Sequence, residues 1–360
     1  MIAKTPLHTN HLTLSARMVN FHGWDMPLHY GSQLEEHHEV RLRAGMFDVS
    51  HMTIVDILGA GGRQFLRKLL TNDVDQLHHS GRGLYSCMCN AHGGIIDDLI
   101  VYQRASDNYR IVLNSATRTQ DLAWIRSKSE GFAVGLQERK ELSMIAVQGP
   151  EAIAKTISIL TPAQIDAVST LTPFESVDVG SWFFARTGYT GEDGLEIIVP
   201  EAEIATLFSS LLSAGVKPCG LAARDTLRLE AGLLLYGQDM DATTTPLESG
   251  LAWTVKFQPE DRDFIGMGAL LSQKQQGLSR KMVGLILEDK GIMRTGQRVV
   301  VEGALDGIIT SGTYSPTLEK SIALARVPIE TGERVLIDIR GKLVPARVGK
   351  PRFVKNGQPL

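Results

Sequence analysis

The pattern of the sequence changes near Arg280. Before it, strands and amphipathic helices follow one another without regular βαβ order, whereas after it short strands and turns continue to the end and no long amphipathic helix occurs. The chain has 360 residues, which is more than one hydrophobic core usually serves. These features predict an α+β fold for about the first 250 residues and a β-barrel or sandwich at the end, joined through the polar stretch 272–280.

Hydrophobic periodicity predicts the individual elements of the first part. Strands are expected at 52–58, 99–103, 110–114, 142–147, 182–187 and 195–199, and helices at 63–70, 117–129, 151–160, 201–214 and 221–235. The two strands at 99–103 and 110–114 should form a hairpin, and Thr117 should cap the helix that follows them. Residues 309–318 are small and polar and are predicted to form a loop between strands.

The composition argues against several classes of protein. A formal net charge of −3 provides no general attraction to nucleic acid or to acidic membranes, and no apolar run is long enough to span a bilayer. Three cysteines do not make a disulfide framework, and the N-terminal residues lack the features of a leader peptide. We therefore expect a cytoplasmic protein.

Motifs for metals and nucleotides are also missing from the sequence. All ten histidines lie in the first 92 residues, but none has the spacing of a metal-ligand motif. The stretch GAGGRQ at 59–64 approaches the dinucleotide fingerprint G-x-G-x-x-G, but Gln64 stands in place of its third glycine and no βαβ series follows. No phosphate-binding loop of the Walker A type occurs. We therefore expect neither a metal nor a nucleotide cofactor.

An acidic pair interrupts the apolar run at 93–101. Residues two apart in a strand share a face, so Asp97 and Asp98 point to opposite faces, each among apolar neighbours. An unpaired buried charge costs several kcal/mol or more, so these carboxylates require partners or a task. The simpler alternative is that Asp97 caps the preceding glycine turn and Asp98 faces water.

Two further segments carry unusual chemistry. The stretch 186–197 contains three glycines in a tight turn, followed by Glu196 in a strand, where its carboxylate can accept two N–H donors from a flat heterocycle. The alternative is a hairpin with a solvated glutamate. Arg224 and Arg228 share one face of a predicted helix and need anionic partners, which are either a ligand carboxylate or the structural neighbours Asp225 and Glu230.

Taken together, these segments resemble the T-protein family of the glycine cleavage system, the tetrahydrofolate-dependent aminomethyltransferases. The matching runs are TPL at 5–7, FHGW at 21–24, GMFDVSHM at 45–52, GGIIDDL at 93–99, GYTGEDG at 188–194, AARDTLRLE at 222–230 and ITSGTYSPTL at 309–318. Each run alone is a weak signal, but their number and order are specific, and they extend over nearly the whole chain.

The resemblance implies a three-domain cloverleaf around a central folate channel. The first, discontinuous α+β domain would comprise residues 1–51 and 139–250, and the second α+β domain residues 52–138. A linker at 251–280 would lead to a C-terminal all-β barrel or jelly-roll-like domain at 281–360. The implied reaction takes an aminomethyl group from the lipoyl arm of H-protein, releases ammonia and forms 5,10-methylenetetrahydrofolate, a step of glycine catabolism and one-carbon metabolism.

The resemblance also implies roles for particular residues. Asp98 matches the family's catalytic aspartate, Glu196 falls where the pterin edge binds, and Arg224 matches a substrate-binding arginine. Further residues would line the same pocket: Tyr85, Asn114, Tyr189, Tyr236 and Trp253, together with Met52 and Phe174. Tetrahydrofolate would be the co-substrate, and lipoylated H-protein the direct partner, with P-protein and L-protein acting indirectly. The basic residues Lys217, Lys256 and Arg352 are candidates for docking the acidic carrier.

Two alternatives remain open at this stage. One is another folate-dependent one-carbon transferase, such as the folate-binding half of a sarcosine or dimethylglycine oxidising enzyme, although those chains usually carry an additional flavin domain. The other is a non-enzymatic folate-binding protein of the same fold. Such relatives lack the aspartate pair and carry a cysteine in the glycine turn, whereas this turn, at 188–191, has none.

Overall fold

The computed structural model describes residues 2–360, which form two compact units. Unit 1 comprises Met1–Phe65, Val74–Leu84 and Leu99–Asp225, and unit 2 comprises Leu66–Asp73, Tyr85–Asp98 and Thr226–Leu360. Each unit is therefore assembled from three separate segments. The division into three domains that the sequence suggests stays a prediction.

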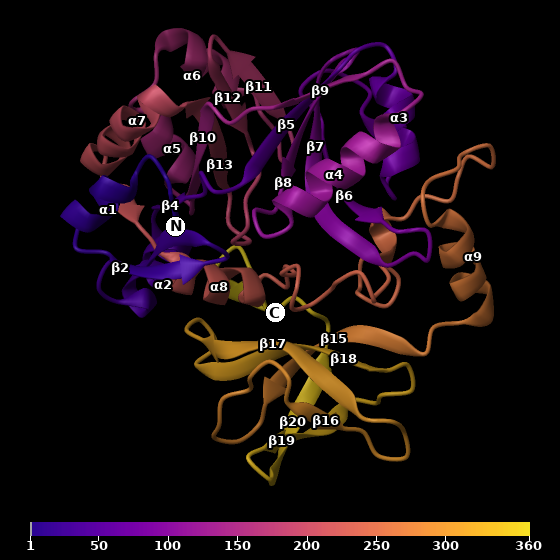
Figure 1. Ribbon diagram of the computed structural model, residues 1–360. Coiled ribbons are helices and arrows are strands. Elements are labelled where there is room, and N and C mark those ends of the chain that lie inside the picture. The colour runs from indigo at the N-terminus through magenta and orange to yellow at the C-terminus, as the bar shows by residue number, and fades with distance from the viewer. Residues whose placement is uncertain (1) are drawn as a thin grey trace. The chain divides into compact units, whose positions relative to one another are not determined.

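A six-stranded sheet with the order β11-β12-β13-β10-β4-β14 forms the centre of unit 1. Its strands are β4 (Gly45–Asp48), β10 (Leu142–Gln148), β11 (Ser176–Val179), β12 (Trp182–Ala185), β13 (Gly194–Pro200) and β14 (Lys217–Pro218). The helices beside it are α5 (Ala152–Ile157), α6 (Pro162–Ser169) and α7 (Glu201–Ser213) (Figure 1). The strands and helices expected at 142–147, 195–199 and 201–214 are thus confirmed.

Alternation along β13 decides which side chains this sheet presents to its helices. Leu195 and Ile197 are fully buried in one apolar cluster with Leu207 and Leu211 of α7. Successive side chains of a strand point to opposite faces, so Glu196 points to the face away from this cluster. The helix-covered face is therefore the core, and the other face carries the glutamate.

The remaining strands that lie wholly or partly in unit 1 form two further sheets, which helices accompany. A small sheet has the order β1-β3-β2, with β1 (Ala3–Lys4), β2 (Arg17–Phe21) and β3 (Trp24–His29), near α1 (His8–Thr13) and α2 (Gln33–Leu42). A five-stranded sheet has the order β6-β7-β8-β5-β9, with β5 (Thr53–Leu58), β6 (Gly83–Cys89), β7 (Ile95–Ala105), β8 (Asn108–Leu113) and β9 (Gly135–Glu138). The helical segments that accompany it are α3 (Gly62–Leu69), η1 (Val74–Gln76) and α4 (Arg118–Ser129).

The expected hairpin is confirmed, because β7 and β8 pair antiparallel with a turn at 106–107. The predicted threonine cap of α4 is wrong in its detail. Thr117 does precede the helix, but its side chain makes no capping bond and instead donates to the carbonyl oxygen of Asn114 at 3.2 Å. The hydroxyl thus closes the turn before the helix.

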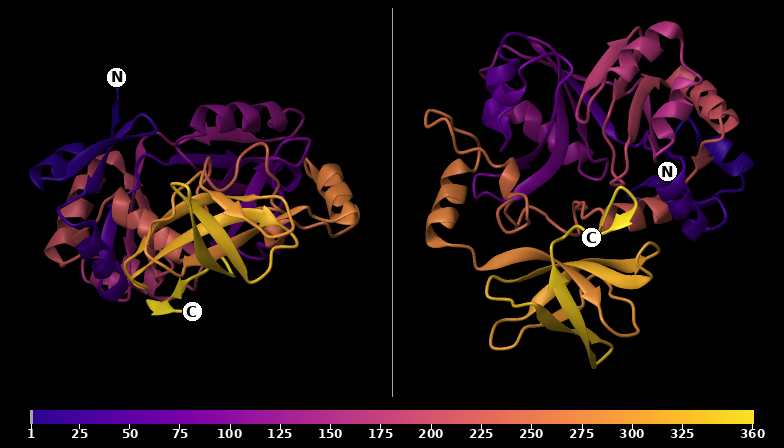
Figure 2. Two further views of the ribbon diagram at one scale, coloured as in Figure 1. Left: turned by 90° about the horizontal axis from the view of Figure 1, so that it is seen from below. Right: turned by 180° about the vertical axis from the view of Figure 1, so that it is seen from behind.

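Unit 2 contains the C-terminal barrel, whose closed strand order is β15-β18-β17-β16-β19-β20. The strands, drawn in orange to yellow in Figure 2, are β15 (Arg280–Leu287), β16 (Arg298–Val300), β17 (Gly307–Ser315), β18 (Lys320–Pro328), β19 (Arg334–Ile339) and β20 (Lys342–Gly349). A short hairpin of β21 (Val354–Lys355) and β22 (Gln358–Pro359) follows. The predicted all-β end beginning near Arg280 is confirmed.

The loop predicted at 309–318 is mostly strand, so that prediction was wrong. Residues up to Ser315 belong to β17, which pairs with β18 and shifts register between Ile309 and Ser311. Ile309 is fully buried in the barrel core. Burial and pairing inside a closed barrel outweigh the weak strand preference of its small residues.

Helix α8 (Leu221–Glu230) ends five residues earlier than its periodicity suggests. Gly232 has a φ of +72°, and the N–H of Leu233 returns to the carbonyl oxygen of Arg228. A glycine in the left-handed region is a common helix terminator because it has no Cβ to clash. Beyond it, η2 (Ala252–Thr254) and α9 (Met267–Gln276) lie within the stretch predicted as a linker. Among residues 2–360, no helix is long and apolar enough to cross a membrane.

Candidate functional site

Glu196 is a buried carboxylate in the middle of β13. It is 9% exposed and lies opposite Ala146 of β10 and Ala185 of β12, whose small side chains leave room on this face of the sheet. Burial raises the pKa of Glu196, a shift that the Thr187 hydrogen bond and the charge of Arg224 partly offset. The solvated hairpin residue of the simpler interpretation is therefore wrong.

A chain of two buried hydroxyls, from Tyr102 to Thr187, ends at the Glu196 carboxylate. Thr187 Oγ1 donates to Oε2 of Glu196 at 2.5 Å, and Tyr102 Oη lies 2.9 Å from Thr187 Oγ1. Since the threonine proton is directed to the carboxylate, Tyr102 is the donor in the second bond. Neither residue was predicted from the sequence. Thr187 directly precedes the glycine turn and could have been suspected, whereas Tyr102 is 85 positions away and gave no signal.

The glycine turn before Glu196 is built around Gln148. Its Oε1 accepts from the Thr190 hydroxyl at 2.9 Å and its Nε2 donates to the Thr187 carbonyl at 3.0 Å. A Cβ at Gly188 would lie 1.8 Å from Gln148 Oε1, so any other residue there would displace the amide of Gln148 from these hydrogen bonds. Arg41 donates to the Thr190 carbonyl at 2.7 Å from the other side. The turn is therefore a fixed element.

Arg224 from α8 contributes a cation to unit 1. Its guanidinium lies over the rings of Tyr189 and Phe47, with the guanidinium carbon 4.8 and 5.8 Å from the ring centres. Burial lowers the pKa of Arg224, and Glu196 partly offsets this effect. Its Nη1 is buried, and no atom of residues 2–360 accepts a hydrogen bond from it. Because buried donors are normally paired, this atom is suited to an acceptor on a ligand.

His51 is a second polar residue of unit 1 with an open bonding position. The ring is buried beside Phe21, and within residues 2–360 its Nδ1 has no hydrogen-bond partner. Burial lowers the pKa of His51 to about 4, helped by Arg224 and opposed by Asp48. His51 is therefore neutral at pH 7. His51 belongs to the run 45–52 that matches the family, but no role was predicted for it from the sequence.

Asp98 lies in unit 2, near the start of β7. It is half-buried, and the hydroxyl of Tyr85 donates to its Oδ2 at 2.9 Å. The ring of Tyr85 stacks on Trp253, with 5.6 Å between ring centres and 21° between planes. Asp97 is fully buried. Asp98 is the more accessible of the two carboxylates, and two aromatic side chains organise its surroundings.

Tyr236 belongs to the same part of unit 2. Its hydroxyl donates to the carbonyl oxygen of Ile95 at 3.0 Å, which ties it to the first residue of β7. It packs with Tyr85 against a buried apolar cluster that includes Cys87 and Met240. Tyr85, Tyr236 and Trp253 therefore surround the beginning of the strand that carries Asp98.

The other predicted residues are Tyr189, Asn114, Phe174 and Met52. Tyr189 contacts Arg224 as described, and Asn114 directly follows β8. Phe174 is 41% exposed and has a φ of +64°, and Met52 is half-buried before β5. The roles of Asn114, Phe174 and Met52 stay predictions. No group of three or more histidine, cysteine, aspartate or glutamate side chains within residues 2–360 could hold a metal ion.

Comparisons with known proteins address the family. The model of the GCVT N-terminal domain matches residues 7–259, and that of the glycine cleavage T-protein C-terminal barrel domain matches residues 280–355. The chain is 80% identical to the aminomethyltransferases of two Legionella pneumophila strains, Corby and Lens, over 360 residues and the full length of each. The chain belongs to the glycine cleavage T-protein family.

A solved structure of the family supports the fold. The crystal structure of glycine cleavage system aminomethyltransferase T from Bartonella henselae matches with a TM-score of 0.92 at 33% identity, covering 99% of each chain. The mixed α+β fold with a C-terminal barrel is therefore that of the T-protein family. This membership was predicted from the ordered runs of residues around Asp98, Glu196 and Arg224.

Proposed function

We infer that this chain is an aminomethyltransferase of the glycine cleavage system. We propose that it takes the aminomethyl group from the lipoyl arm of H-protein, releases ammonia and passes the methylene group to tetrahydrofolate. The family match and the 80% full-length identity to aminomethyltransferases support the reaction class. Direct binding of lipoylated H-protein, with P-protein and L-protein acting indirectly, belongs to the same proposal, as does a cytoplasmic location.

The observation that carries the folate part of the proposal is the buried Glu196. A carboxylate inside a sheet, held by Thr187, has lone pairs suited to the N–H donors of a flat pterin edge. The unpaired Nη1 of Arg224 supplies a donor for an anionic or carbonyl group of the same ligand. These two residues of unit 1 thus support the proposal of a folate as co-substrate.

Asp98 is suited to the chemical step. Departure of ammonia leaves positive charge on the carbon attached to sulfur, and a carboxylate stabilises such charge. Nitrogen N5 of folate must lose a proton as it attacks this carbon, and Asp98 can accept that proton. The Tyr85 hydroxyl fixes one carboxylate oxygen, so it limits the orientations that Asp98 adopts. Exclusion of water would protect the reactive carbon from hydrolysis.

One assay tests the whole proposal. Aminomethylated H-protein and tetrahydrofolate are mixed with the chain, and methylenetetrahydrofolate, ammonia and free dihydrolipoyl thiol are measured. We expect all three products in equal amounts. Tetrahydrofolate binding without turnover would overturn the enzymatic assignment in favour of a folate-binding protein, and absence of both would overturn the proposal entirely. Charge-reversal variants of Lys217, Lys256 and Arg352 then identify which of them, if any, docks the carrier.

A further inference from the structure

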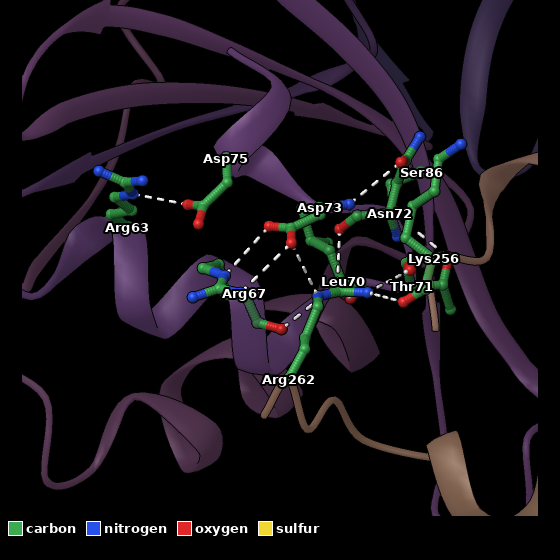
Figure 3. A network of polar contacts seen from close by, with 10 residues as sticks. All are labelled: Arg63, Arg67, Leu70, Thr71, Asn72, Asp73, Asp75, Ser86, Lys256 and Arg262. Carbon is green, nitrogen blue, oxygen red and sulfur yellow. Dashed lines mark hydrogen bonds and ion pairs between the residues drawn. The ribbon is translucent and has the colours of Figure 1, made fainter. Parts of the chain in front are cut away.

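Arg262 is a buried cation that the proposed reaction does not use. It is 4% exposed and follows η2 in the chain of unit 2. Its guanidinium donates to five backbone carbonyl oxygens, those of Arg67, Leu70, Thr71, Asn72 and Lys256. Its Nε lies 3.5 Å from Asp73 Oδ2 (Figure 3). Several of these carbonyls follow the end of α3, where the helix dipole favours a cation.

The carbonyls that Arg262 holds belong to a segment that contacts strand β6. Asn72 Nδ2 donates to the carbonyl oxygen of Tyr85 at 2.9 Å, and the Asn72 N–H donates to Ser86 Oγ at 3.0 Å. Thr71 bonds the next residue of β6, Cys87, twice: the Thr71 N–H donates to the Cys87 carbonyl oxygen at 3.0 Å, and the Cys87 N–H donates to Thr71 Oγ1 at 3.3 Å. The segment 70–73 therefore determines where Tyr85 lies.

The same cation also holds the segment that carries Trp253. Arg262 bonds the Lys256 carbonyl, and the Lys256 N–H donates to the Thr71 carbonyl at 3.0 Å. Thr254 Oγ1 approaches Cys87 Sγ at 3.9 Å. The segment 70–73, which bonds Tyr85 through Asn72, and the segment that carries Trp253 are thus joined at a single guanidinium.

We propose that Arg262 is a positioning residue for Asp98, acting through Asn72 and Tyr85. The proposal rests on the assigned aminomethyltransferase function. The bonds run from the guanidinium to the 70–73 segment, from Asn72 to the Tyr85 carbonyl, and from the Tyr85 hydroxyl to Asp98. Arg262 fixes the aromatic pair on both sides, and the pair fixes the carboxylate. A lysine keeps the charge but cannot reach five carbonyls at once.

The test compares kcat and KM in Arg262→Lys, Tyr85→Phe and the double variant. We expect kcat to fall about ten-fold in each single variant, while the KM for tetrahydrofolate stays within two-fold. The double variant should fall no further than either single one, because residues acting through one path are not additive. The proposal would be overturned if the kcat loss of the double variant were the product of the two single losses, or if folded Arg262→Lys had a normal kcat. Asn72→Ala removes the middle link and should reproduce the loss if Arg262→Lys does not fold.

Arg110→Lys serves as the matched control. Arg110 is as buried as Arg262, and its guanidinium also makes several hydrogen bonds, donating to Asp56 at 2.7 and 2.9 Å. It lies in unit 1, whereas the segments that Arg262 bonds belong to unit 2. The Arg110→Lys variant should melt at a lower temperature than the wild type but should keep its kcat at temperatures where it is folded. If Arg110→Lys lost as much kcat as Arg262→Lys, replacing any buried arginine would lower kcat through the stability of the fold. That result would also contradict a positioning role for Arg262.

A spectroscopic readout separates this inference from the proposed function. The chain has four tryptophans, so incorporation of 5-fluorotryptophan gives four ¹⁹F resonances, and Trp253→Phe identifies one of them. Arg262→Lys should shift or broaden the Trp253 resonance and leave the other three in place. If the wild-type chain forms no methylenetetrahydrofolate, the function fails while this result still decides the positioning. An unchanged Trp253 resonance would refute the positioning of the aromatic pair.

Discussion

The two carboxylates proposed for the reaction are held by hydroxyl groups of different kinds. Glu196 is bound by Thr187 inside a sheet, and Asp98 is bound by Tyr85 at a half-buried position. A buried carboxylate with few donors favours ligand groups that complete its hydrogen bonds. An accessible carboxylate with one oxygen held by a tyrosine hydroxyl has a limited set of orientations and can be reached by reacting atoms. Their environments therefore match binding and chemistry, respectively.

The first prediction concerns Asp98→Asn, which keeps the volume and removes the charge. Turnover should fall on the order of 100-fold or more, because charge stabilisation and proton acceptance are both lost. Folate binding should weaken much less. Steady-state kinetics and folate titration measure the two effects. Asp97→Asn should reduce turnover less, since its side chain points to the other face of β7, and near-normal turnover in Asp98→Asn would refute the assignment.

The second prediction concerns Glu196→Gln. Tetrahydrofolate should bind at least ten-fold more weakly, because charge-assisted hydrogen bonds worth roughly 1.5–3 kcal/mol each are lost. Calorimetric titration measures this affinity. An unchanged affinity would remove Glu196 from the folate site.

The same variant has a second, independent readout in the protein without ligand. Because the pKa of Glu196 is raised, its protonated form contributes stability below the ordinary glutamate pKa, and this stability is lost as pH rises through the raised value. Glutamine cannot ionise, so Glu196→Gln should melt at or above the wild-type temperature at pH 8, and the difference should shrink at pH 4. A lower melting temperature at pH 8 would contradict the raised pKa.

The chemical character of a residue and its sequence neighbours determined which site residues could be predicted from the sequence. A carboxylate inside an apolar run is visible without a structure, which is why Asp98 and Glu196 were predicted as candidates. Tyr85, which donates to Asp98, was predicted as a pocket residue, whereas Tyr102 was not visible because it lies 85 positions from its partner Thr187. Arg262 was not visible either. It lies in a polar segment where a surface arginine is the ordinary expectation, and its carbonyl partners at 67–72 leave no side-chain pattern.

At the scale of elements, α8 combines two arginines with different surroundings. Arg224 stacks on Tyr189 and has an unpaired Nη1, whereas Arg228 is 1% exposed and bonds within unit 2. The Nη1 of Arg228 donates to Asp239 Oδ2 at 2.8 Å and its Nη2 to Ser311 Oγ at 2.9 Å. The sequence suggested Asp225 or Glu230 as partners, because it shows only neighbours along the helix. Asp239 comes close only after the helix has ended and the chain has turned back.

The third prediction separates these two arginines by the same substitution. Arg224→Lys should raise the KM for tetrahydrofolate or for the aminomethylated carrier about ten-fold, because the planar fork is lost while the charge remains. Arg228→Lys should instead lower the free energy of unfolding by about 1–3 kcal/mol with both KM values unchanged. Kinetics and melting curves of the two variants distinguish the roles. A change in melting temperature alone for Arg224→Lys would make it structural.

Element boundaries were predicted where local chemistry determines them. The hairpin of β7 and β8 follows from alternation on both sides of a turn, and α7 follows from its apolar stripe. Residues of β17 were mistaken for a loop, because a strand inside a closed barrel owes its structure to pairing with β18, which leaves no local signal. The discontinuity of the units could not be predicted from periodicity at all.

At the scale of the whole molecule, two continuous elements run from one unit into the other. Strand β7 passes from unit 2 into unit 1 between Asp98 and Leu99, and helix α8 passes from unit 1 into unit 2 between Asp225 and Thr226. Candidate residues therefore lie directly beside both crossing points. No single cut of the chain separates the units, since each takes three segments. Stability measurements should accordingly be made on the full chain.

The fourth prediction concerns acid stability and depends on Asp56 of β5. This carboxylate is 1% exposed and bonds Arg110 twice, at 2.7 and 2.9 Å, Arg104 at 3.2 Å and Arg139 at 2.5 Å. Burial raises the pKa of Asp56, but the three arginines outweigh burial and lower it below the ordinary value. Its stabilisation is therefore present above about pH 3.9 and is lost as pH falls through the lower folded value.

Asp56→Asn should lower the free energy of unfolding by about 3–5 kcal/mol at pH 7, because it leaves Arg110 buried without its counter-charge. The loss should become smaller at pH 3, because below about pH 3.9 the unfolded chain takes up a proton at Asp56 more readily than the folded chain does, and the wild-type stabilisation declines. Denaturant titrations of the full chain at the two pH values measure this convergence. Glu141→Gln is the control, since Glu141 also bonds Arg139 but is 57% exposed at its side chain, and it should change stability by less than about 1 kcal/mol. Equal losses for Asp56→Asn at pH 7 and pH 3 would show that the aspartate acts through shape and not through charge.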